Sequence, residues 1–113
     1  MSLEINSFET DGSLIYRLVG RLDTNTSPDF EATLTEQLSK GRQRFMIDLG
    51  AIDYISSAGL RVFLMLAKKV GRGKGKMVLY GMSDHVKEVF DIAGFTKIFT
   101  IEPDAAAAQT HFG

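Results

Sequence analysis

Between residues 27 and 101, three amphipathic helical segments alternate with three short apolar strand segments, and this predicted order limits the possible folds more than any other feature of the chain. Such alternation is typical of parallel strands joined by right-handed crossovers. Before it, residues 3–8 and 14–19 resemble strands and flank Asp11-Gly12, a dipeptide that favours a hairpin turn. We therefore expect an α/β fold with a mixed β-sheet, an antiparallel N-terminal edge hairpin and helices packed mainly on one side.

Capping residues and glycines mark where the expected helices begin and end. Ser27 followed by Pro28 predicts the start of the first helix, with the Ser27 hydroxyl as its N-cap. The second helix is expected over residues 57–70. Ser83 predicts the N-cap of the third helix, which should end at Gly94.

Three apolar runs, at residues 45–49, 77–80 and 98–101, predict short buried strands between these helices. Pro103 could open a last helix, and an alanine run follows it. We therefore expect residues 103–113 to form either a C-terminal helix or a frayed tail.

Length and composition exclude several classes of protein. The 113 residues suit one domain, placed at 1–113, of which residues 1–3 could be a leader. The absence of cysteine excludes disulfides and thiolate metal sites. The formal charge of -1 gives no overall positive excess for nucleic-acid binding. No apolar run approaches the roughly 20 residues of a membrane-spanning helix, so we expect a soluble, cytoplasmic protein.

Charge is divided unevenly along the chain. Residues 1–36 carry seven acids and two bases, residues 37–76 carry nine bases and two acids, and residues 77–113 carry five acids and two bases. A domain polarised in this way favours electrostatic steering of a partner. Charged helix faces that serve solubility explain most of these residues equally well.

Residues 53–60 are the most informative segment, because they link a predicted buried strand to a helix. Ligands collect at this carboxyl end of the strands in open α/β sheets. A helix start has unpaired N–H groups and partial positive charge, which would stabilise a phosphate at that place. Ala58 and Gly59 are small and would let another molecule approach the backbone. The simpler alternative is that Ser57 or Ser56 is only an N-cap.

A helical wheel divides the second helix into an apolar side and a basic side. The apolar side holds Leu60, Phe63, Leu66, Ala67 and Val70. The basic side holds Arg61, Lys68 and Arg72, with Lys69 at its edge, Met65 among these charges and Val62 at the boundary. An exposed methionine in a basic stripe suits an adaptable protein-binding surface, although a lone surface methionine needs no such role.

Three motifs in this order resemble the STAS domain family, and within it the bacterial anti-sigma-factor antagonists. The first is Gly20-Arg21-Leu22-Asp23, which is similar to the G-x-L-D element after the family's second strand. The second is Asp48-Leu49 followed by residues 53–60, which is similar to the family's phosphorylation loop. The third is Ser83-Asp84-His85-Val86 with Phe90 and Gly94-Phe95, which fits the third-helix region. The resemblance covers nearly the whole chain and implies a STAS-like fold.

The resemblance implies that Ser57 is phosphorylated, since the family's serine lies two residues before the glycine of the Gly-Leu pair. Ser56 stands where the best-known antagonists often have aspartate, and Ala58 where they often have serine or threonine. Ser56 is therefore a second candidate acceptor. Asp23 matches an aspartate beside the serine loop, where it would orient the free hydroxyl or affect recognition by a kinase. Polar contacts there could also come from Thr24, Asn25 and Thr26.

The resemblance also implies the partners. The unphosphorylated chain would bind an anti-sigma factor that is a serine protein kinase, and the sigma factor would be released. The kinase, with its own ATP and Mg²⁺, would then phosphorylate Ser57, and a serine phosphatase would reset the cycle. The expected contact residues are Arg61, Val62, Met65, Lys68 and Lys69. Alternatively, the chain is a STAS scaffold or regulatory module of a stress-signalling complex or of an anion or lipid transport system.

The sequence carries no enzyme motif, and we expect no catalytic residue, cofactor or metal. A serine hydrolase elbow needs G-x-S-x-G, but Ile55 stands where its first glycine would be. His85 and His111 fall in a helix start and in the tail, and no metal or nucleotide motif is present. The glycine-rich segment 71–75 follows a helix, so it predicts a turn and not a phosphate cradle. Direct nucleic-acid binding is disfavoured, because aromatic residues are not interleaved with the bases of residues 37–76.

Overall fold

A five-stranded sheet in the order β1-β2-β3-β4-β5 forms the centre of the computed structural model, which describes residues 3–10, 12–73 and 75–112. Its strands are β1 (Leu3–Thr10), β2 (Ser13–Leu22), β3 (Arg44–Ile55), β4 (Lys76–Tyr80) and β5 (Thr100–Glu102). β1 is antiparallel to β2, and the other neighbours are parallel. The predicted mixed sheet with an antiparallel edge hairpin is confirmed, although Asp11 of the turn lies outside the described residues, as do residues 1–2, Lys74 and Gly113.

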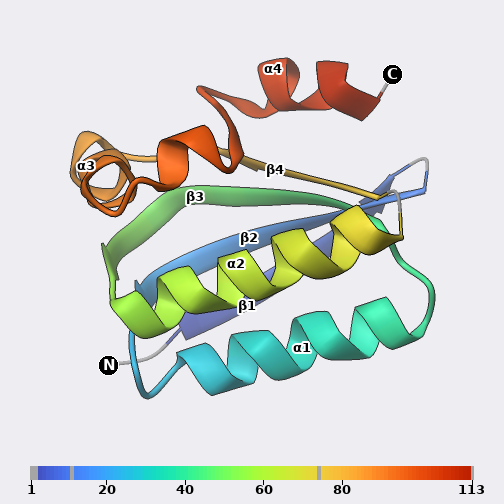
Figure 1. Ribbon diagram of the computed structural model, residues 1–113, viewed down its shortest axis with the longest axis horizontal. Coiled ribbons are helices and arrows are strands. Elements are labelled where there is room, and N and C mark those ends of the chain that lie inside the picture. Colours follow the sequence, from blue (N-terminus) through green and yellow to red (C-terminus); the bar gives the residue numbers. More distant parts are fainter. Residues whose placement is uncertain (1–2, 11, 74, 113) are drawn as a thin grey trace.

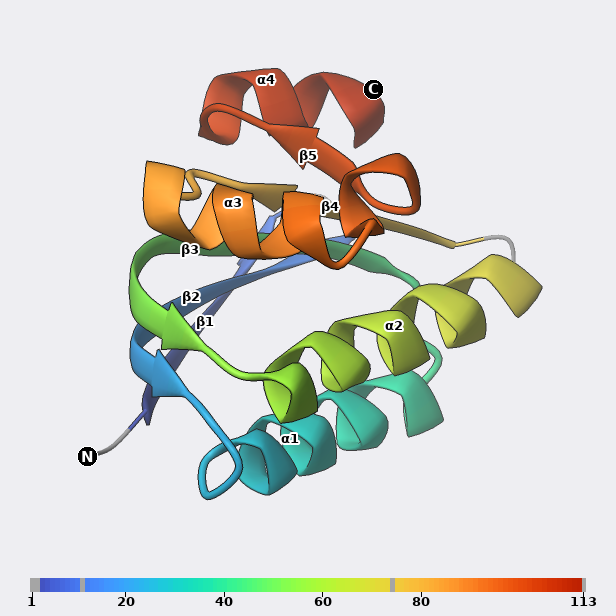
Figure 2. The same ribbon diagram turned by 60° about the vertical axis from the view of Figure 1, so that its left-hand side comes forward.

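Four α-helices are described: α1 (Ser27–Ser39), α2 (Ser57–Arg72), α3 (Asp84–Ile92) and α4 (Ala105–Gln109). α1 and α2 lie side by side along one face of the sheet (Figures 1 and 2). Phe63 of α2 packs against Phe30 of α1 and Phe90 of α3, with ring centroids 5.5 Å and 6.0 Å apart, so these three helices share one core. α4 belongs to a separate small cluster, in which Ala108 packs with Met46 of β3. The prediction that helices pack mainly on one side is confirmed.

Two helix termini form as their capping residues predict. The Ser83 hydroxyl accepts a hydrogen bond from the N–H of Val86 at 3.3 Å and caps α3. Gly94 has a φ of 77°, a left-handed conformation that suits glycine and ends the helix. In the C-terminal segment, the Asp104 carboxylate accepts from the N–H of Ala107 at 2.9 Å and caps α4.

The prediction that Ser27 is an N-cap is wrong, because the cap of α1 is Thr26 and Ser27 is the first helical residue. The loop between β2 and α1 ends one residue earlier than the Ser27-Pro28 pair predicts. In this loop the Ser27 hydroxyl donates to the backbone carbonyl of Asp23. Pro28 still lies in the first turn, where its missing N–H has no cost.

All five predicted strands have different bounds in the structure, and the differences in β3 and in the last strand have clear physical reasons. β3 continues beyond residue 49 to Ile55, because irregularities in its register with β2 allow pairing as far as Leu22↔Ile55. The last strand is Thr100–Glu102, preceded by a 3₁₀ turn over Phe95–Lys97. The apolar residue Phe99 is buried by its contacts with Phe90 and Phe95, so its apolar character reflects loop packing and not membership of a strand.

Candidate functional site

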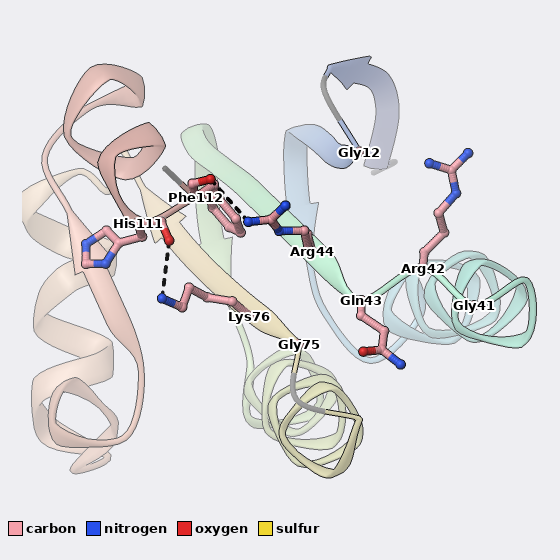
Figure 3. A pocket seen from close by; sticks show the side chains of 9 residues that line it. All are labelled: Gly12, Gly41, Arg42, Gln43, Arg44, Gly75, Lys76, His111 and Phe112. Carbon is pink, nitrogen blue, oxygen red and sulfur yellow. Dashed lines mark hydrogen bonds between the residues drawn. The ribbon is translucent and has the colours of Figure 1, made fainter.

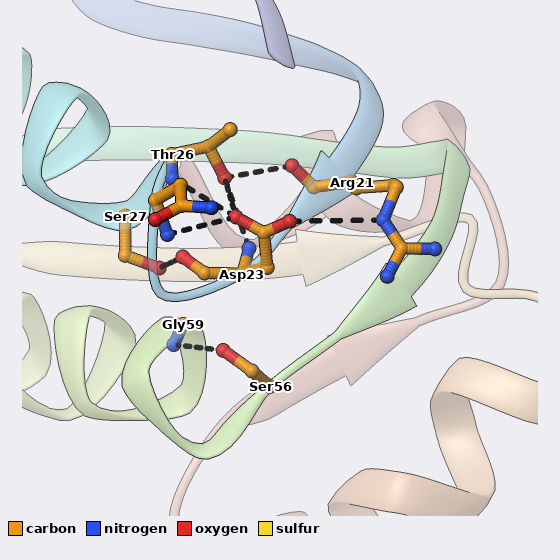
Figure 4. Close-up of polar contacts among 7 residues, drawn as sticks. Arg21, Asp23, Thr26, Ser27, Ser56 and Gly59 are labelled. Atoms are coloured by element: carbon orange, nitrogen blue, oxygen red, sulfur yellow. Dashed lines mark hydrogen bonds and ion pairs between the residues drawn. The ribbon is translucent and has the colours of Figure 1, made fainter. Parts of the chain in front are cut away.

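The serine loop is anchored where β2 and β3 end together. The N–H of Ser56 donates to the carbonyl of Leu22 at 2.9 Å, and α2 begins at the next residue. The Ser56 hydroxyl accepts from the N–H of Gly59 at 3.2 Å, which makes Ser56 the N-cap of α2 (Figure 4). The two adjacent serines therefore have different roles, and the capping role falls on Ser56.

Ser57 is the first residue of α2, and its side chain is exposed. Within residues 3–10, 12–73 and 75–112 its hydroxyl makes no hydrogen bond. The first intrahelical bond is the one from the N–H of Leu60 to the carbonyl of Ser56, at 3.0 Å. The N–H groups of Ser57 and Ala58 precede that bond, so they belong to the unpaired donors of a helix start. Among the residues that the structure describes, Ser57 thus presents a hydroxyl oxygen without a hydrogen bond, beside N–H groups that have no intrahelical partner.

Gly59 serves the internal packing of the protein, in contrast to the expectation that it leaves room for another molecule. Gly59 is buried, and a Cβ at this position would lie 2.9 Å from Cγ of Leu22 and 3.0 Å from its carbonyl oxygen. The missing side chain lets α2 start directly against β2. Ala58 is half-buried and lines a surface groove.

Asp23 organises the loop between β2 and α1. One oxygen of its carboxylate accepts from the N–H groups of Asn25 at 2.9 Å and Thr26 at 3.0 Å, and from the Thr26 hydroxyl at 3.2 Å (Figure 4). The other oxygen lies 3.6 Å from Nε of Arg21. These hydrogen bonds lower the pKa of the Asp23 carboxyl, and the bond from the Thr26 N–H has the largest effect. The charge of Arg21 makes a smaller contribution in the same direction. Asp23 is therefore held as an ordered carboxylate.

No hydrogen bond joins the Asp23 carboxylate to the hydroxyl of Ser56 or Ser57 in the described part of the chain. The expectation that Asp23 orients the free hydroxyl therefore finds no support in its contacts, since these all lie within its own loop. Its effect on kinase recognition stays a prediction. Thr24 and Asn25 are exposed on the same loop.

A stacked pair that sequence inspection missed lies at the same edge of the sheet. Arg21 and Tyr54 are register partners on β2 and β3, and the Arg21 guanidinium lies 4.3 Å from the centroid of the Tyr54 ring. Because Arg21 also contacts Asp23, the pair connects the loop before α1 with the strand that leads to Ser56. Both residues belong to the motifs that carry the family resemblance, but only the cross-strand register brings them together.

A groove of about 340 Å³ between α1 and α2 collects several predicted site residues. It is lined by Thr24, Ser27, Pro28, Glu31, Ala58, Arg61, Val62 and Met65. Two residues expected near the phosphorylation site, Thr24 and Ala58, thus share a surface with three expected to contact the partner. Val62 is only 4% exposed and forms part of the groove wall, so a partner has little access to its side chain.

The outer face of α2 carries a second, shallow groove that continues from the first. Its lining residues are Arg61, Leu64, Met65, Lys68, Lys69 and Arg72. Arg61 and Met65 line both grooves, which joins the predicted partner residues into one surface. We call this surface the α2 face. Leu64 was not predicted to belong to it, although its spacing of three residues from Arg61 and four from Lys68 could have placed it there.

Among the described residues, no group of three or more His, Asp or Glu side chains is placed to hold a metal ion. No helix in residues 3–10, 12–73 and 75–112 is both long enough and apolar enough to cross a bilayer.

Comparison with known proteins identifies the family. Residues 4–108 match the model of the STAS domain. The chain is 41% identical over 110 residues to BtrV of Bordetella bronchiseptica, a proposed anti-sigma factor antagonist. The aligned region covers 97% of this chain and 95% of BtrV. It is 31% identical over 102 residues to the anti-sigma-B factor antagonist of Listeria monocytogenes, and this alignment covers 90% of this chain and 89% of that protein. The chain belongs to the STAS domain family, and these relatives in it carry the name of anti-sigma factor antagonists.

A solved structure shows the same fold. The phosphorylated form of SpoIIAA, a Bacillus cell fate determinant, aligns with a TM-score of 0.77 at 16% sequence identity, covering 97% of this chain and 100% of SpoIIAA. At this level of identity the likeness concerns the fold alone. The predicted STAS-like fold is confirmed.

Proposed function

We propose that this chain is an anti-sigma factor antagonist whose binding is switched by phosphorylation of Ser57. The unphosphorylated chain binds an anti-sigma factor that has serine kinase activity, and the sigma factor is thereby released in the cytoplasm. The names of the two relatives support the antagonist role, and the SpoIIAA structure supports phosphorylation as a state compatible with this fold. The observation that carries the choice of Ser57 is its exposed hydroxyl, which makes no hydrogen bond to the described residues and lies beside the capping serine.

In this proposal the kinase supplies ATP and Mg²⁺, and the chain supplies only the acceptor oxygen. The Ser57 oxygen forms a bond to the γ-phosphorus while the bond from that phosphorus to the departing ADP breaks. The hydroxyl proton passes to a base of the kinase. A phosphatase hydrolyses the ester with water, releasing inorganic phosphate and restoring the hydroxyl. The chain therefore needs no catalytic residue, cofactor or metal of its own.

Phosphorylation at Ser57 would add about -1.5 to -2 charges at the start of α2. The partial positive charge of the helix N-terminus stabilises that phosphate. Arg61 lies one turn later, and helical side chains lean toward the N-terminus, so its guanidinium can approach the phosphate. The switch is therefore local and leaves the fold of the chain intact.

The same phosphate would oppose binding of the partner. The α2 face carries Arg61, Lys68 and Lys69 around Met65, a pattern complementary to an acidic surface with an apolar centre. The groove between α1 and α2 reaches Ala58, directly after Ser57. A phosphate there would be desolvated on docking and would be repelled by acidic groups of the partner. Loss of this complementarity releases the kinase.

Phosphorylation assays can test this function directly. The chain is incubated with ATP and the serine kinases of the organism that encodes it, and its intact mass is measured. We expect a gain of one phosphate in the wild type and in Ser56→Ala, and no gain in Ser57→Ala. A gain that persists in Ser57→Ala and disappears in Ser56→Ala would assign the site to the other serine. No gain with any kinase would favour a scaffold role over an antagonist role.

A further inference from the structure

The sheet has a second face, opposite the one that α1, α2 and α3 cover. Side chains alternate between the two faces along a strand, and in β2 the buried residues Leu14, Tyr16 and Leu18 point into the core shared by these helices. Among the described α-helices, only α4 lies on the second face (Figure 2), where it packs on β3, β4 and β5. The rest of this face, on β1 and β2, carries three register pairs, which we call the open face: Phe8 with Ile15, Asn6 with Arg17, and Glu4 with Val19.

An apolar row crosses the second face and ends on the open face. Phe8 is the register partner of Ile15, and Ile15 is the register partner of Met46 on β3. Met46 is buried in the small cluster with Ala108 of α4, and Ile15 is partly buried against that cluster. At the outer end of the row the Phe8 side chain is 55% exposed. The apolar row that α4 covers over β3 therefore continues uncovered to the edge of the sheet.

The described C-terminal residues are bound to the other half of this face and do not cover the open face. Nη2 of Arg44 on β3 donates to the carbonyl of Phe112 at 3.1 Å, and Nζ of Lys76 on β4 donates to the carbonyl of His111 at 3.2 Å (Figure 3). The His111 ring also contacts the carboxylate of Glu102 on β5. These contacts to three successive strands fix residues 111 and 112 over β3, β4 and β5. A group that covers the open face must therefore come from another molecule.

The charges of the open face indicate which molecule that is. Glu4 and Arg17 are both exposed, and they lie two residues apart in the register of β1 and β2. Neither forms an ion pair with a side chain of residues 3–10, 12–73 or 75–112. One acid and one base on the same surface are complementary to a second copy of that surface, whereas a partner of one sign would meet a like charge. The α2 face carries bases around Met65, so a second copy of the α2 face would be repelled there.

We propose that the open face binds a second copy of this chain and forms a symmetric dimer. A two-fold axis parallel to the strands, between β1 and β2, places Phe8 of each copy against Ile15 of the other. The same axis places Glu4 of each copy diagonally opposite Arg17 of the other, so that both contacts occur twice. The α2 face lies on the opposite side of the sheet and stays accessible in this dimer. The inference is therefore independent of the proposed function, and either can fail without the other.

The first experiment is sedimentation velocity of the full chain over a concentration series that reaches the millimolar range. We expect a dimer whose fraction rises with concentration, and Phe8→Glu should weaken the association about tenfold or more, because it buries a charge in the apolar contact. The control, Ile92→Glu, makes the same change at a residue of α3 that is 80% exposed and lies outside the open face, and it should leave the dimer unchanged. A wild type that stays monomeric would overturn the proposal and leave the open face to a different protein. Equal weakening by both variants would overturn it as well.

The second experiment exchanges the two charges between copies. Glu4→Arg alone brings two bases together at each diagonal contact of the dimer, and Arg17→Glu alone brings two acids together, so each variant should dimerise more weakly than the wild type. A mixture of the two variants restores opposite charges at both contacts, and the mixed dimer should form more tightly than either dimer of identical copies. Mixing cannot repair a folding defect, so this recovery depends on the contact between copies. A mixture that associates no better than the separate variants would overturn the proposed arrangement.

Discussion

Gly59 and Leu22 are in such close contact that the start of α2 has no space for a side chain between helix and sheet. A Cβ on Gly59 would lie 2.9 Å from Cγ of Leu22, which is itself fully buried, and 3.0 Å from its carbonyl oxygen. The neighbouring Ser56 donates its N–H to the same carbonyl at 2.9 Å. This contact places Ser57 at the surface, two residues beyond the end of β3. The position of the proposed phosphorylation site therefore depends on internal packing.

Replacing Gly59 by alanine inserts a methyl group into a packed core, which usually costs about 1–3 kcal/mol, and we expect a net destabilisation of up to about 2 kcal/mol. The preference of helices for alanine over glycine, about 1 kcal/mol, opposes this loss but does not exceed it. The free energy of unfolding in urea measures the net effect.

Gly71→Ala is the matched control in the same helix. A Cβ at Gly71 would meet nothing within 4 Å. The only expected effect of the substitution is therefore the higher helix propensity of alanine. It should stabilise the protein by up to about 1 kcal/mol. If Gly59→Ala were as stabilising as Gly71→Ala, the close contact with Leu22 would have no energetic role.

The two adjacent serines should respond differently to substitution by alanine. Ser56→Ala removes the hydroxyl that caps α2 and should cost about 1 kcal/mol of stability. Ser57→Ala removes an exposed hydroxyl without a hydrogen-bond partner in the described residues and should change stability by less than about 0.5 kcal/mol. Urea unfolding of both variants makes the comparison, and a larger cost at Ser57 would contradict the division of roles.

Much of the fold and the location of the serine loop could be predicted from local patterns. The cap at Ser83 and the left-handed turn at Gly94 follow from residue type, because each depends on the conformation of a few neighbouring residues. The alternation of helices and strands predicted the parallel sheet, because each helix and strand can also be recognised from neighbouring residues alone. Once β3 was expected to be followed by a helix, residues 56 and 57 had to lie at the carboxyl edge of the sheet.

The remaining features depend on contacts between distant segments. The irregular pairing that extends β3 to Ile55 depends on β2 and cannot be predicted from the residues of β3 alone. The contact with Leu22 that requires Gly59 to lack a side chain also depends on β2. Sequence inspection also left open which serine is the cap, because either hydroxyl could have reached the helix start. The alignment of Phe8 with Ile15 likewise appears only in the register of β1 and β2.

Asp23 should make stability depend on pH in the acidic range. Its pKa is lower in the folded chain than in the unfolded chain, so its contribution is complete above the ordinary aspartate pKa of about 3.9 and is lost as pH falls through the folded value. We expect Asp23→Asn to be less stable than the wild type at neutral pH, and the difference to shrink below about pH 4.

Urea midpoints of both proteins across this range measure the shrinking difference. Asp23→Ala, which also removes the accepting oxygen, should be less stable than Asp23→Asn throughout. A difference between wild type and Asp23→Asn that stays constant from neutral to strongly acidic pH would rule out this linkage.

Reversing a charge on the α2 face should weaken binding of the kinase. Lys68→Glu replaces a base beside Met65 with an acid and should slow association, with an effect that diminishes at high salt. Lys87→Glu makes the same change on α3, outside the α2 face, and should have little effect. Surface plasmon resonance at two salt concentrations measures both variants, and equal effects would mean that the partner docks elsewhere.

The affinity of the purified kinase for the chain before and after phosphorylation measures whether Ser57 switches binding. The wild type, its enzymatically phosphorylated form and Ser57→Asp are compared by calorimetry in the absence of ATP. We predict that phosphorylation weakens binding about tenfold or more, equivalent to about 1.4 kcal/mol, and that Ser57→Asp weakens it in the same direction. Equal affinity of the kinase for the phosphorylated and unphosphorylated chains would contradict the account.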